Sequence, residues 1–475
     1  MTKLLGIRMI VLFIILLFVT IPSNAKGKIY LKDCGIEQAN SDVARFEILS
    51  EAHAKAMKEG KTVSYSGIDS LFLEIPHGAK SIKLSGSVDF GNTVFVVKNK
   101  YKDFVLFIMA GTSNVIEVNK QEIDRGYYND RVLKRGSNIL VISDKNVWSE
   151  RIGHSNAAYR KDVVCIKKGR ALSTVCSPYD NAQSNSECMY FPAAKKRTAI
   201  SNLHFVRSSE SSKQTFLLQI KYMNNVLLDN LTIKTPDSDL YGDRAIWIEN
   251  CYDVRLQNIV IDGTYSLSNK YGYGIQLENV TRFYADGIVA RGKWGIFGTN
   301  NVNTSYLKNC EINRFDIHCY GKDVVMEDCT IRDLYNQFSG VYGTIKFKRC
   351  HFVNATPYVD GGSYNTNVEH NIVIEDCTME CSNKKNYIVC LHNVRSEVNS
   401  RDVLNEKYLP NIIIRNLIVD MPDEGIGIQV FNILNANYTG ELNGGSISTT
   451  RIKHKNSGRD VKVESCNRQL KIKSK

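Results

Sequence analysis

The feature that most constrains the fold is an eight-residue phrase that recurs through the second half of the chain. Each copy alternates apolar and polar residues, in most copies reaches Asn or Asp at the fifth position, and then alternates again. A period of two is typical of a strand with one buried face, and the fifth residue indicates a bend. The copies are VLLDNLTI at 226, VRLQNIVI at 254, FYADGIVA at 283, SYLKNCEI at 305, VVMEDCTI at 324, IKFKRCHF at 345, IVIEDCTM at 372 and IIIRNLIV at 412.

A second phrase precedes most of these copies, so each unit contains three short strands. Units of roughly twenty residues that repeat in one direction predict a solenoid of stacked parallel coils. The chain is all-β apart from one clear helix expected over residues 42–58, which would cap the first coil. The second phrase reads AIWIEN at 245, GIQLEN at 274, GIFGTN at 295, DIHCYG at 316 and, more loosely, GVYGTI at 340 and GIQVFN at 427.

The N-terminal residues predict export. Lys3 and Arg8 precede an apolar run from Met9 to Ile21, and small residues follow it. This layout indicates a signal peptide over 1–25, whose apolar run of 13 residues is too short to span a membrane. The sequence therefore predicts a secreted, periplasmic or cell-surface protein.

The rest of the chain divides into three segments. Residues 26–200 hold the cap and early or irregular β-coils (a small separate β-domain is equally open), and 201–440 hold the regular coils. Residues 441–475 read as a basic tail. The net charge is +12, or +10 without Lys3 and Arg8 of the signal peptide, and residues 451–475, with nine Lys/Arg and two Asp/Glu, supply +7 of it. A charged end is usually solvated, so nucleic acid is not an expected partner.

Four of the thirteen cysteines occupy the sixth position of the repeat, a column otherwise filled mainly by Leu and Ile. We therefore expect these four to be buried thiols that behave as small hydrophobes, without disulfides or metal. The cysteines outside the repeat are the better disulfide candidates, with the pairing left open. The column comprises Cys310, Cys329, Cys350 and Cys377, and the outside set comprises Cys34, Cys165, Cys176 and Cys188.

The helix, the GKTVSYSG segment after it and the Asn-x-x-Ile coils together resemble the pectate-lyase-like superfamily of right-handed parallel β-helices. The resemblance covers most of the mature chain and implies that fold. It also implies a relation to polysaccharide lyases, glycoside hydrolases and phage tailspikes. The string Arg314-Phe315-Asp316-Ile317-His318 is similar to an Arg-Phe-Asp-x-His run in β-helix proteins of phage tails and bacterial surfaces. In that run Ala usually replaces Ile317, and the following Gly lies closer than Gly321 does here.

Alignment of the second phrase predicts an outer face of aromatic, amide and carboxylate groups. Sugar rings stack on flat aromatic side chains, so these residues are candidates for substrate binding, although outward aromatics also serve to stiffen a sheet. One expected column is Trp247, Gln276, Phe297, His318 and Tyr342, and the neighbouring one contains Glu249, Glu278 and Tyr320.

Two sets of residues on this face are candidates for catalysis. In the first set, Arg314 would neutralise an acidic group, while Asp316 and His318, about 6.6 Å apart on one strand, would flank the substrate without bonding to each other. In the second, Glu249 and Glu278 would lie one coil apart, at about 4.8 Å, a spacing that suits a retaining glycosidase. For both sets the alternative is that the side chains only decorate a solvated surface.

Two functions remain open from the sequence. The first is an exported carbohydrate-active enzyme, a polysaccharide lyase or a glycoside hydrolase, with a long glycan along the coils. The second is a non-catalytic glycan-binding or surface-structural protein. Long insertions at 262–273 and 354–370 would flank the glycan. No cofactor is required by any motif and no metal ligands are predicted, although calcium is compatible with the carboxylates.

Overall fold

The structure is a computed structural model of the 475-residue chain. The expected signal peptide and Cys176 lie outside the residues that it describes. Those residues are 27–150, 157–175, 186–235, 244–263, 273–291, 295–318, 320–332, 336–338, 341–360, 371–381, 387–392, 407–408, 410–422, 428–433, 442–443, 445–464 and 472–474.

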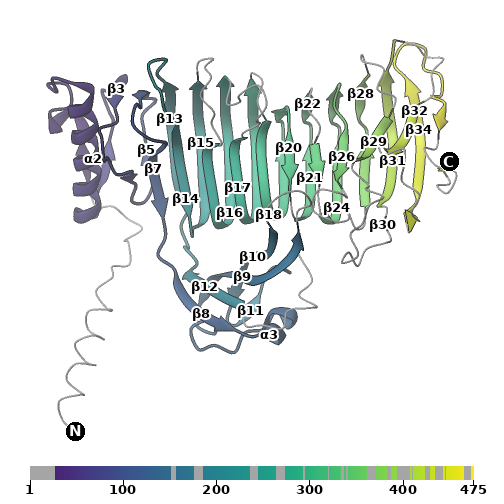
Figure 1. The fold of residues 1–475 in the computed structure, drawn as a ribbon, viewed down its shortest axis with the longest axis horizontal. Helices are drawn as coiled ribbons and strands as arrows, with labels where there is room; N and C mark the ends of the chain where they lie inside the picture. Colours follow the sequence, from purple (N-terminus) through teal and green to yellow (C-terminus); the bar gives the residue numbers. More distant parts are fainter. Residues whose placement is uncertain are drawn as a thin grey trace, which may run out of the picture.

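The dominant element is one sheet of 27 strands, counted over the described residues. Its neighbours pair in parallel, and Figure 1 shows them stacked as coils along one long axis. The all-β solenoid predicted from the repeat is confirmed. The strands are β3 (Ser70–Glu74), β4 (Ile82–Lys83), β5 (Val88–Asp89), β6 (Val94–Lys98), β7 (Phe104–Ala110), β13 (Thr198–Arg207), β14 (Thr215–Lys221), β15 (Asn224–Thr235), β16 (Arg244–Gly263), β17 (Tyr273–Arg291), β18 (Gly295–Lys308), β19 (Glu311–Ile312), β20 (Phe315–Ile317), β21 (Gly321–Glu327), β22 (Thr330–Arg332), β23 (Asn336–Phe338), β24 (Val341–Lys348), β25 (His351–Val353), β26 (Pro357–Asp360), β27 (Asn371–Glu375), β28 (Thr378–Glu380), β29 (Tyr387–His392), β31 (Asn411–Asp420), β32 (Ile428–Ile433), β34 (Ile447–His454), β35 (Val463–Glu464) and β36 (Ile472–Ser474).

The bends between strands come from the residues that the repeat places there. The fifth position of the phrase has a positive φ in successive coils, for example 55° at Asn230 and 53° at Asn258. Asn tolerates this left-handed conformation better than most residues, and its amide can bond to the next coil. Asn230 Nδ2 donates to Asn202 Oδ1 at 2.7 Å, so a hydrogen bond also links neighbouring bends along the axis.

The interior of the coils is a continuous column of apolar side chains. Cys310, Cys329, Cys350 and Cys377 are each at most 2% exposed and belong to this core, as the repeat predicts. Their backbones form a ladder in which each coil bonds to the next, for example Thr330 N–H to Cys310 O at 2.8 Å. These sulfurs therefore fill volume in the stack.

The two ends of the solenoid differ. The helix α2 (Asp42–Glu59) lies across the first coil (Figure 1), with Ser41 capping its N-terminus and Phe46 and Leu49 buried. Next to it, β1 (Lys28–Tyr30) pairs with β2 (Thr62–Ser64), and a short 3-10 helix, η1, covers Leu31–Cys34. At the other end, β34 pairs in parallel with β31, so the coils continue into the basic segment after residue 440.

A second, antiparallel unit is inserted between β7 and β13. Its five-stranded sheet has the order β11-β10-β9-β12-β8, and Figure 1 shows it hanging from the flank of the solenoid. Residues 60–200 therefore contain both early coils and a small separate domain, the two alternatives left open by the sequence. Its elements are β8 (Asn114–Val118), α3 (Lys120–Arg125), β9 (Ser137–Glu150), β10 (Ala157–Lys167), β11 (Arg170–Ala171) and β12 (Ser186–Pro192). Near the C-terminal end, β30 (Lys407–Tyr408) pairs with β33 (Leu442–Asn443).

The disulfide candidates are thiols in the described chain. Cys34 and Cys165 are free, and burial raises the pKa of both. Cys188 is fully buried in the core of the inserted domain, in a different apolar cluster from Cys165. No helix among the described residues is long and apolar enough to cross a membrane.

Candidate active site

The candidate site is built on one outward column of the coils. Parallel pairing sets Gln219 of β14 beside Trp247 of β16, then Gln276 of β17, Gly298 of β18 and Asp316 of β20. Parallel strands in register bring residues that are far apart in sequence to within about 4.8 Å of one another. Trp247 and Gln276 are therefore neighbours, as the repeat predicts.

Three members of the predicted column, Phe297, His318 and Tyr342, lie elsewhere. In the observed register the column continues from Gln276 to Gly298 and Asp316, so Phe297 is displaced by one residue and His318 by two. Phe297 is paired with Ile275 and Phe315, is fully buried, and packs edge-on against the Phe315 ring at 5.6 Å. The large apolar ring turns into the core and leaves Gly298 outward. Tyr342 pairs with Lys322 and is half-buried in a different column. Neither Phe297 nor Tyr342 offers the predicted platform for sugar.

At Asp316 the column ends in a compact polar cluster. Asp316 Oδ2 lies 2.5 Å from Arg314 Nη2 and 3.5 Å from His318 Nε2. The Tyr273 hydroxyl donates to the same Asp316 oxygen at 2.8 Å and lies 2.8 Å from His318 Nε2. We call Arg314, Asp316, His318 and Tyr273 the buried tetrad. The prediction that Asp316 and His318 would not interact is wrong, because the strand ends after Ile317 and His318 turns back towards Asp316.

Tyr273 reaches the tetrad by crossing an intervening coil. It begins β17, whereas Asp316 lies two coils further on, and the ring passes over Gly298 of the coil between them. A Cβ at position 298 would lie 2.4 Å from the Tyr273 ring, closer than van der Waals contact allows. The Tyr273 ring can therefore reach the tetrad because position 298 has no side chain.

The charges in the tetrad are fixed by burial and pairing. Asp316 is fully buried, and burial alone would raise its pKa; the hydrogen bond to His318 and the Arg314 charge outweigh this and lower the pKa. Asp316 is therefore a carboxylate. Because the single hydroxyl proton of Tyr273 goes to Asp316, the bond from Tyr273 to His318 requires a proton on Nε2. His318, with its side chain 19% exposed, is open to solvent.

Glu249 and Glu278 form the second group, and they pair directly in register. Glu249 Oε2 lies 3.6 Å from Lys221 Nζ, while Glu278 Oε1 accepts from Gln276 Nε2 at 2.6 Å and lies 4.0 Å from Arg244 Nη1. Burial raises the pKa of Glu278; the Arg244 charge opposes this, and repulsion from Glu249 adds to it. The pair combines an ion-paired carboxylate with one that holds a proton more tightly.

Trp247 is part of this charged group and not a bare platform. The Arg244 guanidinium lies 4.2 Å from the centre of its ring, and Lys221 Nζ lies 5.1 Å from it. Cation–π contacts of this kind hold the two cations beside the glutamates. A sugar bound here would contact charged side chains arranged around an aromatic ring.

The inserted domain lines one edge of this face. Tyr320 is fully buried beneath β10: its hydroxyl accepts from Lys161 N–H at 2.6 Å, so the prediction that Tyr320 contacts substrate is wrong. Tyr252 packs among apolar residues of the insertion, and Asn303 Nδ2 donates to Thr174 O at 2.9 Å. β10 reaches the solenoid near β18 (Figure 1), which makes the insertion a wall along the column.

Tyr273 is the site residue that the sequence reading missed. It is the last residue of the 262–273 insertion, which was expected to flank a glycan, and that position was the available signal. In the 354–370 insertion, residues 361–370 lie outside the described part of the chain. Within the described residues, no group of three or more His, Cys, Asp or Glu could hold a metal ion.

The fold has counterparts of known structure. No protein-family model and no curated protein matches the sequence. The tailspike protein gp49 from Pseudomonas phage LKA1 is 13% identical, with a TM-score of 0.52 over 90% of this chain and 77% of that one. The chain is a right-handed parallel β-helix.

Two further structures show a looser likeness. The Gp54 tailspike of Acinetobacter baumannii bacteriophage AP22, solved with a capsular saccharide, is 12% identical, with a TM-score of 0.46 over 94% of this chain and 76% of that one. An exopolygalacturonase from Thermotoga maritima is also 12% identical, with a TM-score of 0.39 over 92% and 93% of the two chains. At these identities, the likeness concerns the fold.

Proposed function

We propose that this β-helix cleaves an acidic polysaccharide laid along the coils, with Tyr273 and His318 as the proton-transfer residues. The observation that carries the proposal is the buried tetrad. A fully buried carboxylate paired with a nearly buried arginine is costly to maintain, and here it orients two titratable groups at a surface that is otherwise a regular scaffold. A buried ion pair that orients titratable groups in this way is typical of an active site.

The chemistry that suits the tetrad is β-elimination beside a uronate. Because Tyr273 and Nε2 of His318 already carry protons, Nδ1 of His318 would remove the proton on the carbon next to the carboxylate. The electron pair of that C–H bond would form a carbon–carbon double bond while the glycosidic C–O bond breaks. The Tyr273–His318 couple would then return a proton to the leaving oxygen, so that protons balance over the cycle.

The remaining residues have supporting roles in this scheme. Arg314 is 7% exposed and is bound to Asp316, so it positions the carboxylate and does not reach substrate, unlike the expectation from the sequence. Arg244 and Lys221, three and four coils away from Asp316, are the cations beside Trp247 that a second uronate would meet. Asp316 is a positioning residue, because it is fully buried and its carboxylate contacts Tyr273, Arg314 and His318.

Turnover of uronate-containing polysaccharides tests the proposal. β-Elimination leaves an unsaturated uronate that absorbs ultraviolet light, whereas hydrolysis leaves only a new reducing end. We expect ultraviolet-absorbing product from the wild type and a loss of at least about 100-fold in kcat for Tyr273→Phe and for His318→Ala. Full activity in both variants would overturn the assignment.

Glycoside hydrolysis by the two glutamates is the second candidate. The specific observation in its favour is the direct register of Glu249 and Glu278, with a raised pKa on Glu278 that suits a general acid and an ion-paired Glu249 that suits a nucleophile. This reaction would instead give products with new reducing ends and no ultraviolet absorbance. Glu278→Gln should abolish these products, whereas Tyr273→Phe should still form them. Binding without any cleavage would favour the non-catalytic glycan-binding role.

We also propose that the protein is exported, on the strength of the N-terminal pattern alone. A polysaccharide of capsule or cell-wall size meets the enzyme outside the cytoplasm. N-terminal sequencing of the protein recovered from the medium or periplasm is expected to start after Ala25.

A further inference from the structure

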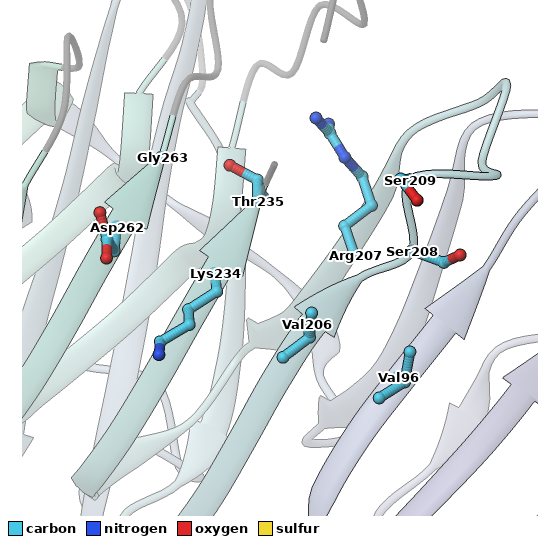
Figure 2. Close-up of a pocket in the computed structure, with 9 residues that line it drawn as sticks. All are labelled: Val96, Val206, Arg207, Ser208, Ser209, Lys234, Thr235, Asp262 and Gly263. Atoms are coloured by element: carbon cyan, nitrogen blue, oxygen red, sulfur yellow. The ribbon is translucent and has the colours of Figure 1, made fainter. Parts of the chain in front are cut away.

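A hollow lies on a different face of the coils from the candidate active site, at the carboxyl ends of β6, β13, β15 and β16 (Figure 2). Its volume is about 610 Å³, within the range of sites that hold small molecules or short oligomers. Asp262 and Gly263 end β16, whereas Arg244 and Trp247 lie at its start, and the left-handed bends at Asn250 and Asn258 lie between them. The hollow is therefore separate from the candidate active site.

The floor of the hollow is a single outward column whose side chains change from apolar to charged along its length. Val96, Val206, Lys234 and Asp262 follow one another in register on four successive coils. Three steps of about 4.8 Å give a floor about 14 Å long. The two valines are half-buried and apolar, the lysine is exposed, and the aspartate is half-buried. An apolar surface that passes into a cation and then a hydrogen-bond acceptor matches a sugar chain, which has apolar C–H faces and polar rims.

One wall of the hollow is already rigid. Ser208 N–H donates to Val97 O at 2.8 Å, and Ser208 Oγ accepts from Glu210 N–H at 3.2 Å. Further along the same turn, Ser212 N–H donates to Asn99 O at 2.9 Å. A wall that is ordered before the ligand arrives lowers the entropic cost of binding.

A buried cation lies behind that wall. Arg207 is 1% exposed, and its Nη1 donates to Gln214 Oε1 at 2.9 Å. Figure 2 shows its guanidinium rising between Thr235 and Ser209, at the side of the hollow. Lys234 is the exposed cation of the hollow, with Asp262 beside it in register. A ligand carboxylate can form a charge-assisted contact with this lysine.

We propose that this hollow is an accessory glycan site that takes an acidic oligosaccharide. A uronate carboxylate would bind Lys234 Nζ, the C–H faces of adjoining rings would cover Val96 and Val206, and a sugar hydroxyl would donate to Asp262. The proposal rests on the proposed function, because the ligand is a segment of the same acidic polysaccharide. A site on a separate face would hold the polymer on the enzyme while another segment reacts.

Direct binding of trigalacturonic acid, with maltotriose as the neutral counterpart, tests the site by calorimetry. The measurements use the full chain carrying Tyr273→Phe, so that the ligand is not consumed. In this background Lys234→Met is expected to weaken trigalacturonate binding by at least about tenfold, because a charge-assisted contact is lost. The matched control is Lys213→Met, because Lys213 is exposed, lies next to Ser212 and is outside the hollow. Its affinity for trigalacturonate is expected to change by no more than about twofold.

Three results would overturn the accessory site: no saturable binding of trigalacturonate, equal binding of maltotriose, or no effect of Lys234→Met. Failure of the proposed function looks different. If no polysaccharide is cleaved while trigalacturonate binding still depends on Lys234, the hollow is a glycan site on a non-catalytic protein. If cleavage depends on Tyr273 while Lys234→Met binds like its parent, only the accessory site is lost.

Discussion

The two polar groups of the outer face differ mainly in burial. Glu278 lies two coils from Asp316 and Glu249 three. In the tetrad, the side chains of Arg314 and Asp316 are 8% and 0% exposed. In the other group, those of Glu249 and Glu278 are 23% and 30% exposed. Both groups arise because parallel coils bring distant residues into register. The tetrad alone is closed over by a residue from another coil, Tyr273.

This difference separates a fixed arrangement from an adjustable one. A buried carboxylate must keep its partners, because the penalty for an unpaired charge is several kcal/mol. Half-exposed carboxylates can exchange protein partners for water at little cost. The tetrad is therefore suited to hold reactive groups in one geometry, whereas the glutamates can rearrange around a substrate.

The largest effect is expected from Asp316→Asn. The substitution leaves Arg314 as a buried charge without its carboxylate, and removal of one partner of such a pair costs about 3–5 kcal/mol of unfolding free energy. Urea denaturation followed by tryptophan fluorescence measures this, with Trp247 on the same face. The half-exposed control, Glu278→Gln, is expected to change stability by less than about 1 kcal/mol. Equal effects of the two substitutions would show that burial does not distinguish the groups.

The next effect tests how Tyr273 is admitted to the tetrad. In Gly298→Ala the new Cβ would lie 2.4 Å from the Tyr273 ring, so the ring must move. We expect kcat to fall about 10- to 100-fold and stability to fall by about 1–3 kcal/mol, the usual cost of overpacking.

A double-mutant cycle with Tyr273→Ala provides the control for this prediction. Once the ring is absent, Gly298→Ala is expected to cost little further stability, because the steric conflict is gone. If the stability losses of the two single variants simply add in the double variant, the glycine is required by the strand and not by the Tyr273 ring.

The repeat predicts the scaffold well because it averages over many copies. The buried cysteine column and the bends at Asn230 and Asn258 follow from a pattern of apolar and bend positions that recurs from coil to coil. Phe297 shows where this logic fails. In GIFGTN, the alternation of Phe and Gly is too weak to set the register against GIQLEN, and only the packing against Phe315 shows that the ring points inward.

The tetrad could be predicted only in part. Arg314, Asp316 and His318 are close in sequence, so their association is local and was proposed. Tyr273 comes from more than forty residues away along the chain, over a glycine that no pattern singled out. Likewise, the burial of Tyr320 depends on an inserted domain whose docking leaves no periodic signal.

A third prediction uses pH to separate the two groups. The pKa of Asp316 is lowered in the folded chain, so its stabilising contribution is present above its unfolded pKa of about 3.9 and is lost as the pH falls through its folded value. The pKa of Glu278 is raised by burial, so the folded chain binds that proton more tightly than the unfolded chain does. Its contribution is therefore favourable at low pH and is lost as the pH rises through the folded pKa.

Glu278→Gln is the variant that tests these opposite signs. At pH 7 it should stabilise the protein slightly, by less than about 1 kcal/mol given the partial exposure, since an unfavourable ionised form is removed. That gain should disappear near pH 4, about the unfolded pKa of glutamate. Thermal denaturation from pH 4 to 8 checks the trend, and a gain that grows towards low pH would contradict the raised pKa.

The smallest effect is expected at the edge of the glutamate pair. Lys221 Nζ lies 3.6 Å from Glu249 Oε2, with its own side chain 31% exposed, so Lys221→Met should change stability by only about 0.2–1 kcal/mol. The same lysine is one of the cations offered to a uronate, so the KM for an acidic polysaccharide should rise several-fold while kcat stays near the wild-type value. A uniform loss of binding energy has this kinetic signature, whereas a loss in kcat would place Lys221 at the reacting bond. Arg244→Met provides the matched comparison, since Arg244 is the other cation against the Trp247 ring. Together the two variants separate binding by the half-exposed group from chemistry in the buried tetrad.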